Sequence, residues 1–287
     1  MGTATKMEVV TQFEAHRPLL FGIAYRMLGD RAAAEDVVQE AFLRARDCPN
    51  VESPRAWLAT VVTRLCLDQL KSARTRRESY VGPWLPEPLP TEGAADDPLM
   101  NRDSISMAFL VLLETLSPLE RAVFLLHEVF DYSHAEVAEI VGKVEAAVRQ
   151  ILHRAKTHVV ARRPRFAGTR EQHQRLLSAF VQACSVGDVE GLKLLLADDV
   201  VTLSDGGGKV HAATRPVSGV DAVARMMVGL TRKGAPGAIP ELRTINGDLA
   251  IVLRLGDLVD TVLTIATDGE RITEIEIVRN PDKLGRI

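Results

Sequence analysis

The sequence contains few cysteines, few aromatic residues and no long hydrophobic run. Its three cysteines, Cys48, Cys66 and Cys184, are widely spaced and have no paired histidines. The sequence therefore predicts neither a disulfide framework nor a zinc site. No apolar segment approaches the roughly 18 residues that would span a bilayer. The start, MGTATKMEVV, lacks the apolar stretch of a signal peptide, and Lys6 stands where a myristoylation motif needs Ser or Thr. We therefore expect a cytoplasmic protein without a membrane anchor.

The sequence also lacks a recognisable catalytic or nucleotide-binding motif. The string DGGGK (205–209) has no Ser or Thr after its lysine, and a strand rather than a helix is expected to follow, so it does not match a phosphate-binding loop. Asp205, His211 and Arg215 are close in sequence, but we expect them to be surface or loop residues. We predict no catalytic residues, no cofactor and no metal, and hence a protein that is not an enzyme.

Charge is distributed unevenly along the 287 residues, a length that suggests two or three domains of roughly 100–200 residues each. The net charge of −3 would argue against a nucleic-acid partner, but the distribution of charge matters more than its sum. Two basic zones lie on either side of an acidic segment, 87–97, and indicate two contacts with DNA. The first zone contains Arg64, Lys71, Arg74, Arg76 and Arg77, and the second contains Arg149, Arg154, Lys156, Arg162, Arg163 and Arg165.

The segment from Leu116 to Val160 predicts a helix-turn-helix. Two S-x-x-E capping boxes, at 117–120 and 133–136, each predict a helix start. The helix that begins after the second box is expected to end at Gly142, and another helix is expected from about Val144.

This last helix separates an apolar face from a basic face. The apolar face contains Ala147, Val148, Ile151, Leu152 and Ala155, and the polar side contains Arg149, Gln150, His153, Arg154 and Lys156. Such a helix fits the major groove, where Arg pairs with guanine, Gln with adenine, and Lys neutralises phosphate. A solvated helix on an ordinary bundle would show the same pattern, so the neighbouring segments have to decide.

The N-terminal residues predict three helices. The first runs from about Val9 to Leu28, and Asp30 is a natural N-cap for the second. The third begins at Ser53-Pro54 and becomes basic towards its C-terminal end, which suits the helix dipole. The second helix has an apolar stripe at helical spacing, made of Ala34, Val37, Val38, Ala41, Phe42 and Ala45.

The strings AEDVVQEAFLRA (34–45) and SPRAWLATVVTRLCLDQLKSARTRR (53–77), followed by the capped helix-turn-helix, resemble the extracytoplasmic-function, or group IV, bacterial sigma factors. The resemblance implies that the first string belongs to region 2, which docks on the β′ clamp of RNA polymerase and melts the −10 element. It implies that the helix-turn-helix is region 4, which reads the −35 element and contacts the β flap. Two positions depart from the family pattern, since Arg64 stands where Asn is frequent and Val144 where Ser or Thr commonly caps the recognition helix.

The resemblance also assigns roles to individual residues. The positions in the polymerase-binding motif are Asp36, Gln39, Glu40 and Phe42. The loop 47–52 lies where such proteins capture a base flipped out of the −10 strand, and Asn50 is its best hydrogen-bonding residue. The expected DNA contacts are Asn50, Arg64, Lys71 and Arg74 in region 2, and Arg149, Gln150, His153, Arg154 and Lys156 in region 4.

From about Thr169 the sequence changes character. Helices are predicted over 171–187, 189–196 and about 220–230, and strands over 200–205 and within 250–278, with a hairpin at Asp268-Gly269. Helices followed by an antiparallel sheet indicate an α+β domain. The order of elements resembles the SnoaL-like, cone-shaped fold, whose curved sheet encloses a pocket.

Three short strings sharpen the resemblance: WLPEP (84–88) in the Pro-rich linker, DGGGK (205–209) after a strand, and NPDKL (280–284) near the end. Together they resemble the sigma factors that carry a fused SnoaL-like extension, which implies that the extension modulates the sigma domains in cis. A linker with Trp84 and several prolines loses little entropy on docking and could latch against the domain, although the glycine run fits a simple tight turn equally well. The expected regulatory contacts are Trp84, Pro86, Asp205, Gly207, Lys209, Asn280 and Asp282.

We therefore predict a multidomain protein in which two all-α sigma domains precede an α+β SnoaL-like domain. The predicted ranges are 1–80 for region 2, 81–103 for an ordered-to-flexible linker, 104–165 for region 4 and 169–287 for the extension. The predicted partners are core RNA polymerase, promoter DNA and, within the chain, the SnoaL-like domain, with no membrane partner and a monomeric free state. The alternative is a ligand-binding or enzymatic SnoaL-like protein whose helix-turn-helix binds an operator.

Overall fold

The computed structural model describes residues 6–46, 53–78, 80–92, 105–160, 168–234 and 237–287. They form two compact units. The first contains Met1–Glu78 and Leu112–Val160, and the second contains Ser79–Val111 and Ala161–Ile287. The residues that link the two helical regions therefore belong to the second unit.

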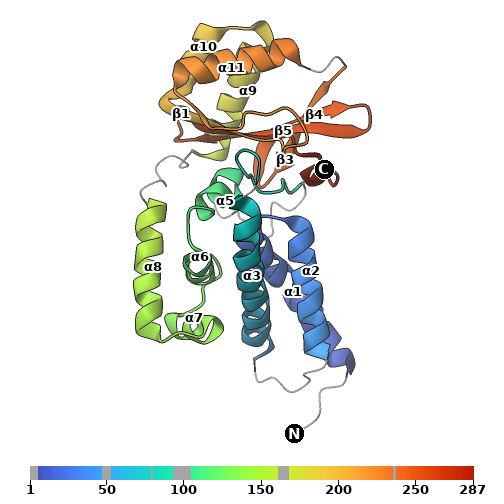
Figure 1. The fold of residues 1–287 in the computed structure, drawn as a ribbon, viewed down its shortest axis with the longest axis vertical. Coiled ribbons are helices and arrows are strands. Elements are labelled where there is room, and N and C mark those ends of the chain that lie inside the picture. Colours follow the sequence, from blue (N-terminus) through green and yellow to red (C-terminus); the bar gives the residue numbers. More distant parts are fainter. Residues whose placement is uncertain (1–5, 47–52, 79, 93–104, 161–167, 235–236) are drawn as a thin grey trace. The chain divides into compact units, whose positions relative to one another are not determined.

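The first unit is helical (Figure 1). Its first part contains α1 (Lys6–Leu28), α2 (Arg31–Arg46) and α3 (Pro54–Glu78), and its second part contains α6 (Pro118–Phe124), the π-helix η2 (Leu125–Val129), α7 (His134–Val141) and α8 (Glu145–Val160). The short helix α5 (Met107–Leu113) lies where the chain passes from the second unit into the first. The predicted apolar stripe of α2 is confirmed, because Ala34, Val37, Val38, Ala41 and Ala45 are buried.

The predicted helix-turn-helix is confirmed. Both capping boxes are formed, since the hydroxyl oxygens of Ser117 and Ser133 accept hydrogen bonds from the backbone N–H groups of Glu120 and Glu136. Gly142 ends α7 in the left-handed conformation, with φ of 65°, which only glycine adopts without strain. The chain then turns directly into α8.

The second unit is the α+β domain that the sequence predicts. Its helices are α9 (Arg170–Val186), α10 (Val189–Leu195) and α11 (Val220–Lys233), and its strands are β1 (Leu196–Asp205), β2 (Val217–Ser218), β3 (Ile239–Ile245), β4 (Asp248–Leu255), β5 (Leu258–Thr267) and β6 (Ile272–Val278). The described strands form one sheet in the order β2-β1-β6-β5-β4-β3, in which only β1 and β6 are parallel. A short 3-10 helix, η4 (Pro281–Lys283), follows β6.

Both faces of this sheet are apolar. Because side chains alternate along a strand, Ile275 and Ile277 of β6 pack against the helices α9, α10 and α11, whereas Val278 faces the other way. That second face is covered by Leu85 of the linker and Met107 of α5. The linker is therefore an integral part of the domain.

Residues 80–92, which we call the strap, are ordered along the sheet. Near its end, Pro90 forms an isolated antiparallel bridge with Ile245, and the backbone N–H of Thr91 donates to the carbonyl of Thr244 at 3.0 Å. The prolines of the strap keep it from continuing as a regular strand, because proline offers no N–H to the ladder. Residues 80–92 of the predicted linker are therefore ordered, and residues 93–103 lie outside the described residues.

Candidate functional site

The exposed side of α2 carries two of the residues expected to bind polymerase. Asp36 and Gln39 are exposed, and Glu40 forms an ion pair with Arg44 at 2.9 Å. Phe42 is instead half-buried, and its ring lies edge-on against the ring of Phe13 with centroids 5.0 Å apart. Asp36 and Gln39 are therefore available to a partner, whereas Phe42 holds α2 against α1.

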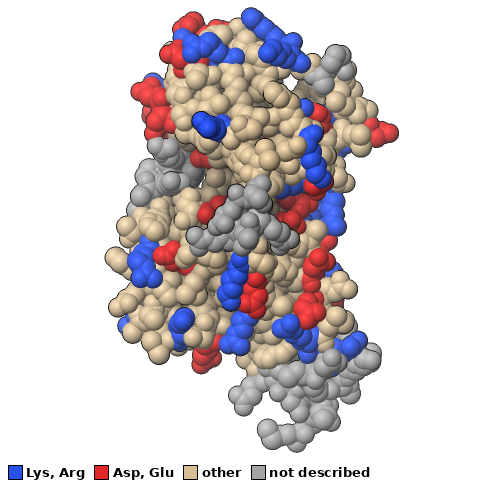
Figure 2. Space-filling model, in the orientation of Figure 1, with Lys and Arg blue, Asp and Glu red and all other residues tan. Residues whose placement is uncertain are grey.

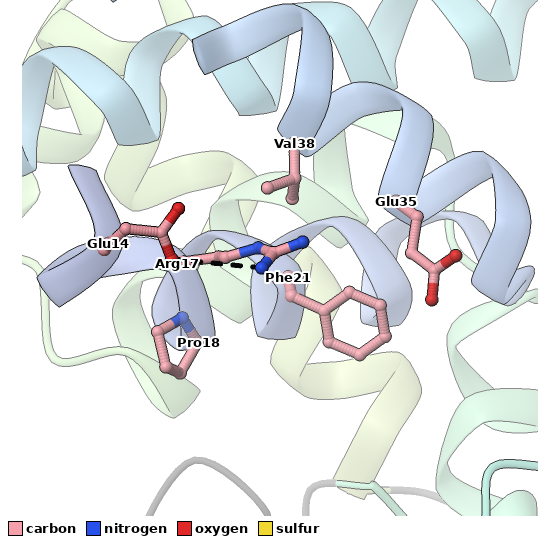
Figure 3. A pocket seen from close by; sticks show the side chains of 6 residues that line it. All are labelled: Glu14, Arg17, Pro18, Phe21, Glu35 and Val38. Carbon is pink, nitrogen blue, oxygen red and sulfur yellow. Dashed lines mark ion pairs between the residues drawn. The ribbon is translucent and has the colours of Figure 1, made fainter. Parts of the chain in front are cut away.

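Beside this surface, α1 and α2 border an open pocket of about 300 Å³ (Figure 3). Its lining residues are Glu14, Arg17, Pro18 and Phe21 from α1, and Glu35 and Val38 from α2. Pro18, Phe21 and Val38 give it an apolar floor, while the charged side chains form its rim, where Arg17 lies 3.9 Å from Glu14. Such a pocket can receive an apolar side chain whose neighbours carry charge.

The expected DNA contacts of region 2 are only partly described. Asn50 lies outside the described residues, and so does the side chain of Arg74. Lys71 is exposed and pairs with Asp68 at 2.8 Å. The guanidinium of Arg64 donates to the carbonyl oxygen of Ile140 in α7 at 3.3 Å, so it contacts the helix-turn-helix.

Further arginines join the two helical parts within the first unit. Arg55 of α3 donates to the carbonyl oxygen of Phe130 at 3.4 Å and lies over the ring of Tyr132, 4.9 Å from its centroid. The buried Arg121 of α6 donates to the carbonyl oxygen of Met27 in α1 at 2.7 Å. In each contact an arginine of one part donates to a backbone carbonyl oxygen of the other part. The contacts therefore require that the two parts pack closely.

The basic residues of α8 all have acidic neighbours. Arg149 forms an ion pair with Glu145, Arg154 lies 3.5 Å from Glu120, and Lys156 lies 2.8 Å from Glu128. Gln150 and His153 are exposed on the same helix. Figure 2 shows positive and negative side chains intermixed on the face that it draws. Exposed ion pairs of this kind contribute about 0–1 kcal/mol, so phosphate groups can replace the carboxylates.

Asp205, at the end of β1, is completely buried in the second unit. Its Oδ2 accepts hydrogen bonds from the backbone N–H of Leu85 at 2.9 Å and from the ammonium group of Lys283 at 2.7 Å. Its Oδ1 accepts the hydroxyl of Tyr80 at 2.6 Å and the backbone N–H of Gly207 at 3.0 Å. The expectation of a surface or loop residue is therefore wrong for Asp205, because these four donors replace water.

Lys283 is the cation that balances Asp205. Its ammonium group also donates to the carbonyl oxygen of Leu85, and it lies 4.1 Å from the ring centroid of Trp84 and 5.4 Å from that of Tyr80. Burial is the main cause that raises the pKa of the Tyr80 hydroxyl, and its hydrogen bond to Asp205 adds to this. The sequence did not predict a role for Lys283, because a lysine is expected to be exposed unless it has a partner, and its partner Asp205 was not foreseen.

The other residues of the three strings meet around this pair. The amide of Asn280 donates to the hydroxyl oxygen of Tyr80 at 2.9 Å, and Lys209 forms an exposed ion pair with Asp282 at 2.6 Å. Gly207 has φ of 61° and lies so close to the amide of Asn280 that a Cβ atom would clash with it. Pro86 of the strap is buried. The glycine run is thus a tight turn pressed against NPDKL. His211 and Arg215 are exposed, as expected.

A second anchor holds the other end of the strap. The buried side chain of Asn246, in the β3–β4 turn, accepts the backbone N–H of Leu89 at 2.8 Å and donates to the carbonyl oxygen of Ile105 at 3.0 Å. Arg243 forms a bidentate ion pair with Glu92 at 2.7 and 2.8 Å. The sequence reasoning missed this anchor, although an Asn-Gly pair flanked by apolar residues is a strong hairpin signal.

Glu276 of β6 is a buried carboxyl group on the strap-facing side of the sheet. Its Oε2 accepts a hydrogen bond from the hydroxyl of Thr264 at 2.8 Å, and its Oε1 has no hydrogen-bond partner among the described residues. Burial, followed by the charge of Glu274, holds its pKa well above the usual range. Burial therefore favours the protonated form of Glu276.

Within the described residues, no three His, Cys, Asp or Glu side chains are grouped so that they could hold a metal ion. Over the same residues, no helix is long and apolar enough to cross a membrane.

Family models match two parts of the chain: Sigma-70 region 2 over residues 12–76 and Sigma-70 region 4 over residues 106–159. The chain is 40% identical to the ECF RNA polymerase sigma factor SigJ of Mycobacterium tuberculosis, over 96% of this chain and 92% of the relative. It is 32% identical to the probable ECF RNA polymerase sigma factor SigI of the same species, over 96% and 94%. The crystal structure of M. tuberculosis SigJ matches with a TM-score of 0.79 and 36% identity, covering 96% of this chain and 97% of that one.

The buried pair of Lys283 and Asp205 predicts a non-additive effect of substitution. Lys283→Met leaves Asp205 as an uncompensated buried charge and should cost about 3–5 kcal/mol, whereas the double variant Lys283→Met/Asp205→Asn should cost clearly less than the sum of the single variants. Urea unfolding of the second unit, followed by Trp84 fluorescence in a Trp57→Phe background, measures this. Lys209→Met, which breaks an exposed ion pair between the same strings, is the matched control and should cost about 0–1 kcal/mol. Additive losses would contradict the assignment.

The raised pKa of Glu276 predicts a loss of stability as the pH rises. Because the folded state holds this proton more tightly than the unfolded state, the stabilisation is complete below the unfolded value, about 4.3, and is lost as the pH rises through the folded value. Glu276→Gln should therefore remove part of the decline in melting temperature between acidic and alkaline pH. The exposed Glu270→Gln should leave the wild-type profile unchanged. Identical profiles for wild type and Glu276→Gln would show that the carboxyl group is not the source.

Proposed function

The chain belongs to the extracytoplasmic-function family of RNA polymerase sigma factors, and from this premise we propose how its parts divide the work of initiation. Residues 1–80 act as region 2, 104–165 as region 4, and 169–287 together with the linker 81–103 as a regulatory domain that acts in cis. The observation that carries this division is the strap, which belongs to the second unit although it joins regions 2 and 4 in sequence. In this proposal the protein is not an enzyme and acts in the cytoplasm.

The β′ clamp of core polymerase binds the exposed side of α2 and the adjoining pocket. Asp36 and Gln39 supply polar contacts, and the apolar floor formed by Phe21 and Val38 receives a side chain of the clamp. Glu40 takes part after exchanging its partner Arg44. Phe42 contributes by holding the two helices together. The β flap contacts region 4.

Promoter DNA binds in two places. Arg64, Lys71 and Arg74, with Asn50 in the loop before α3, serve the −10 element. The polar side of α8 serves the −35 element, with Gln150 and His153 already exposed. Its remaining contacts, which become available when phosphate replaces their carboxylate partners, are Arg149, Arg154 and Lys156.

Regions 2 and 4 must separate before both elements are read. Elements centred about 25 base pairs apart are roughly 85 Å apart at about 3.4 Å per pair, whereas Arg64 and Ile140 are in hydrogen-bond contact in the free chain. Arg64 therefore exchanges a carbonyl group of α7 for DNA as the chain opens. Polymerase drives this opening by binding the open arrangement of regions 2 and 4 more tightly than the closed one.

The second unit gates this opening through the strap. Trp84 and Pro86 are fixed by the contacts around Asp205, while Gly207, Lys209, Asn280 and Asp282 shape the turn that holds them. A docked strap limits the arrangements that regions 2 and 4 can take, and an undocked strap relaxes that limit. The alternative of an operator-binding regulator is set aside, since the chain is similar to sigma factors over 96% of its length.

Reversing the charge on α2 should abolish transcription through loss of core binding. Asp36→Lys places a cation in the proposed β′ contact and should weaken core affinity at least tenfold, a loss of about 1.4 kcal/mol or more. Fluorescence anisotropy with core enzyme and run-off transcription measure the two effects. Glu190→Lys, an equally exposed reversal in α10, is the matched control and should behave as wild type. Unchanged core affinity in Asp36→Lys would place the polymerase contact elsewhere.

Releasing the strap should change the yield of transcript without removing core binding. In run-off assays at saturating core, Lys283→Met should differ from wild type in transcript yield while its core affinity stays within about twofold. A chain ending after region 4 provides a second comparison, and Lys233→Met, at the exposed end of α11, is the control. Transcript yields equal to wild type in both altered chains would end the gating proposal, but would leave the sigma-factor function intact.

A further inference from the structure

Two histidine rings meet at the start of the helix-turn-helix. His127 in η2 and His134 in the first turn of α7 have ring centroids 4.3 Å apart, with the rings tilted by 59°. The chain reaches this arrangement through irregular backbone. The N–H of Phe130 bonds to the carbonyl of Leu125, as a π-helix requires, and Asp131 adopts a positive φ of 57°, which is uncommon for any residue but glycine. Such backbone is found preferentially at functional sites.

The histidine pair lies beside two basic residues of α8. Nδ1 of His127 is 2.7 Å from Oε1 of Glu128, and the ammonium group of Lys156 is 2.8 Å from the same oxygen. Burial lowers the pKa of His134, and the nearby positive charges of His127, Arg149 and Lys156 lower it further. His127 and Lys156 share the carboxylate of Glu128, and the ring of His134 lies against that of His127, so these three basic groups are close enough to act on one ligand.

Two acidic side chains balance this cluster in the free chain. Glu128 serves His127 and Lys156, and Glu145 serves Arg149. The two carboxylates cancel the two permanent cations, so the cluster gains net positive charge only when an imidazole takes a proton. Imidazole is the one side chain whose ordinary pKa, about 6.5, lies in the physiological range.

The position of the cluster indicates its ligand. Arg149 and Lys156 are two helical turns apart on α8, so they lie on the same side of the helix. This side is polar, whereas the side that contains Val148, Ile151 and Ala155 is buried. A duplex held by Arg149 in its groove has its phosphate backbone along the polar side, and the first helix of a helix-turn-helix crosses the backbone. The cluster is thus placed for a phosphate monoanion rather than for a base.

We propose that His127 and His134, together with Lys156, hold a backbone phosphate of the duplex that region 4 binds, and that this binding takes up protons. The proposal rests on the proposed function of region 4 and adds to it a proton-linked phosphate contact. On binding, the phosphate joins Glu128 as a partner of Lys156, and the negative charge that it adds beside the rings favours the imidazolium form. DNA affinity therefore increases as the pH falls through the imidazole range.

The full-length chain and a short duplex of random sequence test the proposal, because phosphate contacts are independent of sequence. Fluorescence anisotropy at constant ionic strength, from about pH 8 to about pH 5.5, gives the affinity across the range of imidazole titration. Wild type should bind about tenfold more tightly at the acidic end for each ring whose pKa the DNA raises by one unit. His127→Gln/His134→Gln should lose the part of this rise that the two rings supply, the exposed His153 of α8 keeping its own contribution, and should keep wild-type affinity near the alkaline end.

The remaining histidines provide the control. His211→Gln, an exposed residue of the second unit, should keep the wild-type pH profile. Histidine C2–H resonances, followed by NMR with and without duplex, should show that DNA raises the pKa of both rings in wild type. His134→Gln alone, at a partly exposed position, gives a variant that keeps the fold should the double variant fail to fold, and it should lose part of the rise.

Three results would overturn the proposal. They are a variant with the wild-type pH profile, a variant weakened by the same factor at every pH, and a wild type that does not bind duplex at any pH. Run-off transcription with core enzyme separates this failure from that of the proposed function. A chain that initiates transcription but shows any of these three results lacks the histidine contact, whereas a chain that fails to initiate lacks the function itself.

Discussion

The sheet of the second unit has apolar side chains on both faces, and this requires that both faces be covered. The helices α9, α10 and α11 cover one face, and the other would expose Val252, Val262 and Val278 to water. Burying apolar surface is worth about 25 cal/mol per Å², so the strap and α5 dock because they supply Leu85 and Met107 to that face. The link between two DNA-reading regions is thereby also a layer of a third domain.

The strap meets this need at low entropic cost. Its prolines restrict the unfolded chain, and they remove N–H groups that would otherwise need partners against the sheet. The polar groups that remain are satisfied at two places, since Asp205 receives the N–H of Leu85 and Asn246 receives that of Leu89. The chain between region 2 and region 4 therefore follows the sheet between two fixed points.

Local patterns were sufficient to predict most of the fold, because capping boxes, helical spacing and strand alternation act over a few residues. The helix-turn-helix and the α+β order are confirmed for this reason. The environments of Asp205 and Lys283 could not be predicted in this way, since Asp205 binds Leu85, 120 residues earlier in the chain. A charged residue is predicted to be exposed until its partner is known. No local pattern indicates that Asp205, Lys283 and Leu85 contact one another. Arg64 shows the same limit, because its partner Ile140 is 76 residues away.

The free chain satisfies internally the same groups that DNA would satisfy in the complex. Arg64 uses a carbonyl group of α7, while Arg149 and Lys156 use carboxylates within or next to the helix-turn-helix. Each exposed pair is weak, so a duplex that offers many phosphates together can replace them, whereas an isolated anion competes poorly. In the proposed complex, the acidic partners would lower the affinity for stray anions more than the affinity for DNA. A net charge of −3 is compatible with this proposal, because the positive groups would become available only where a continuous phosphate backbone replaces their partners.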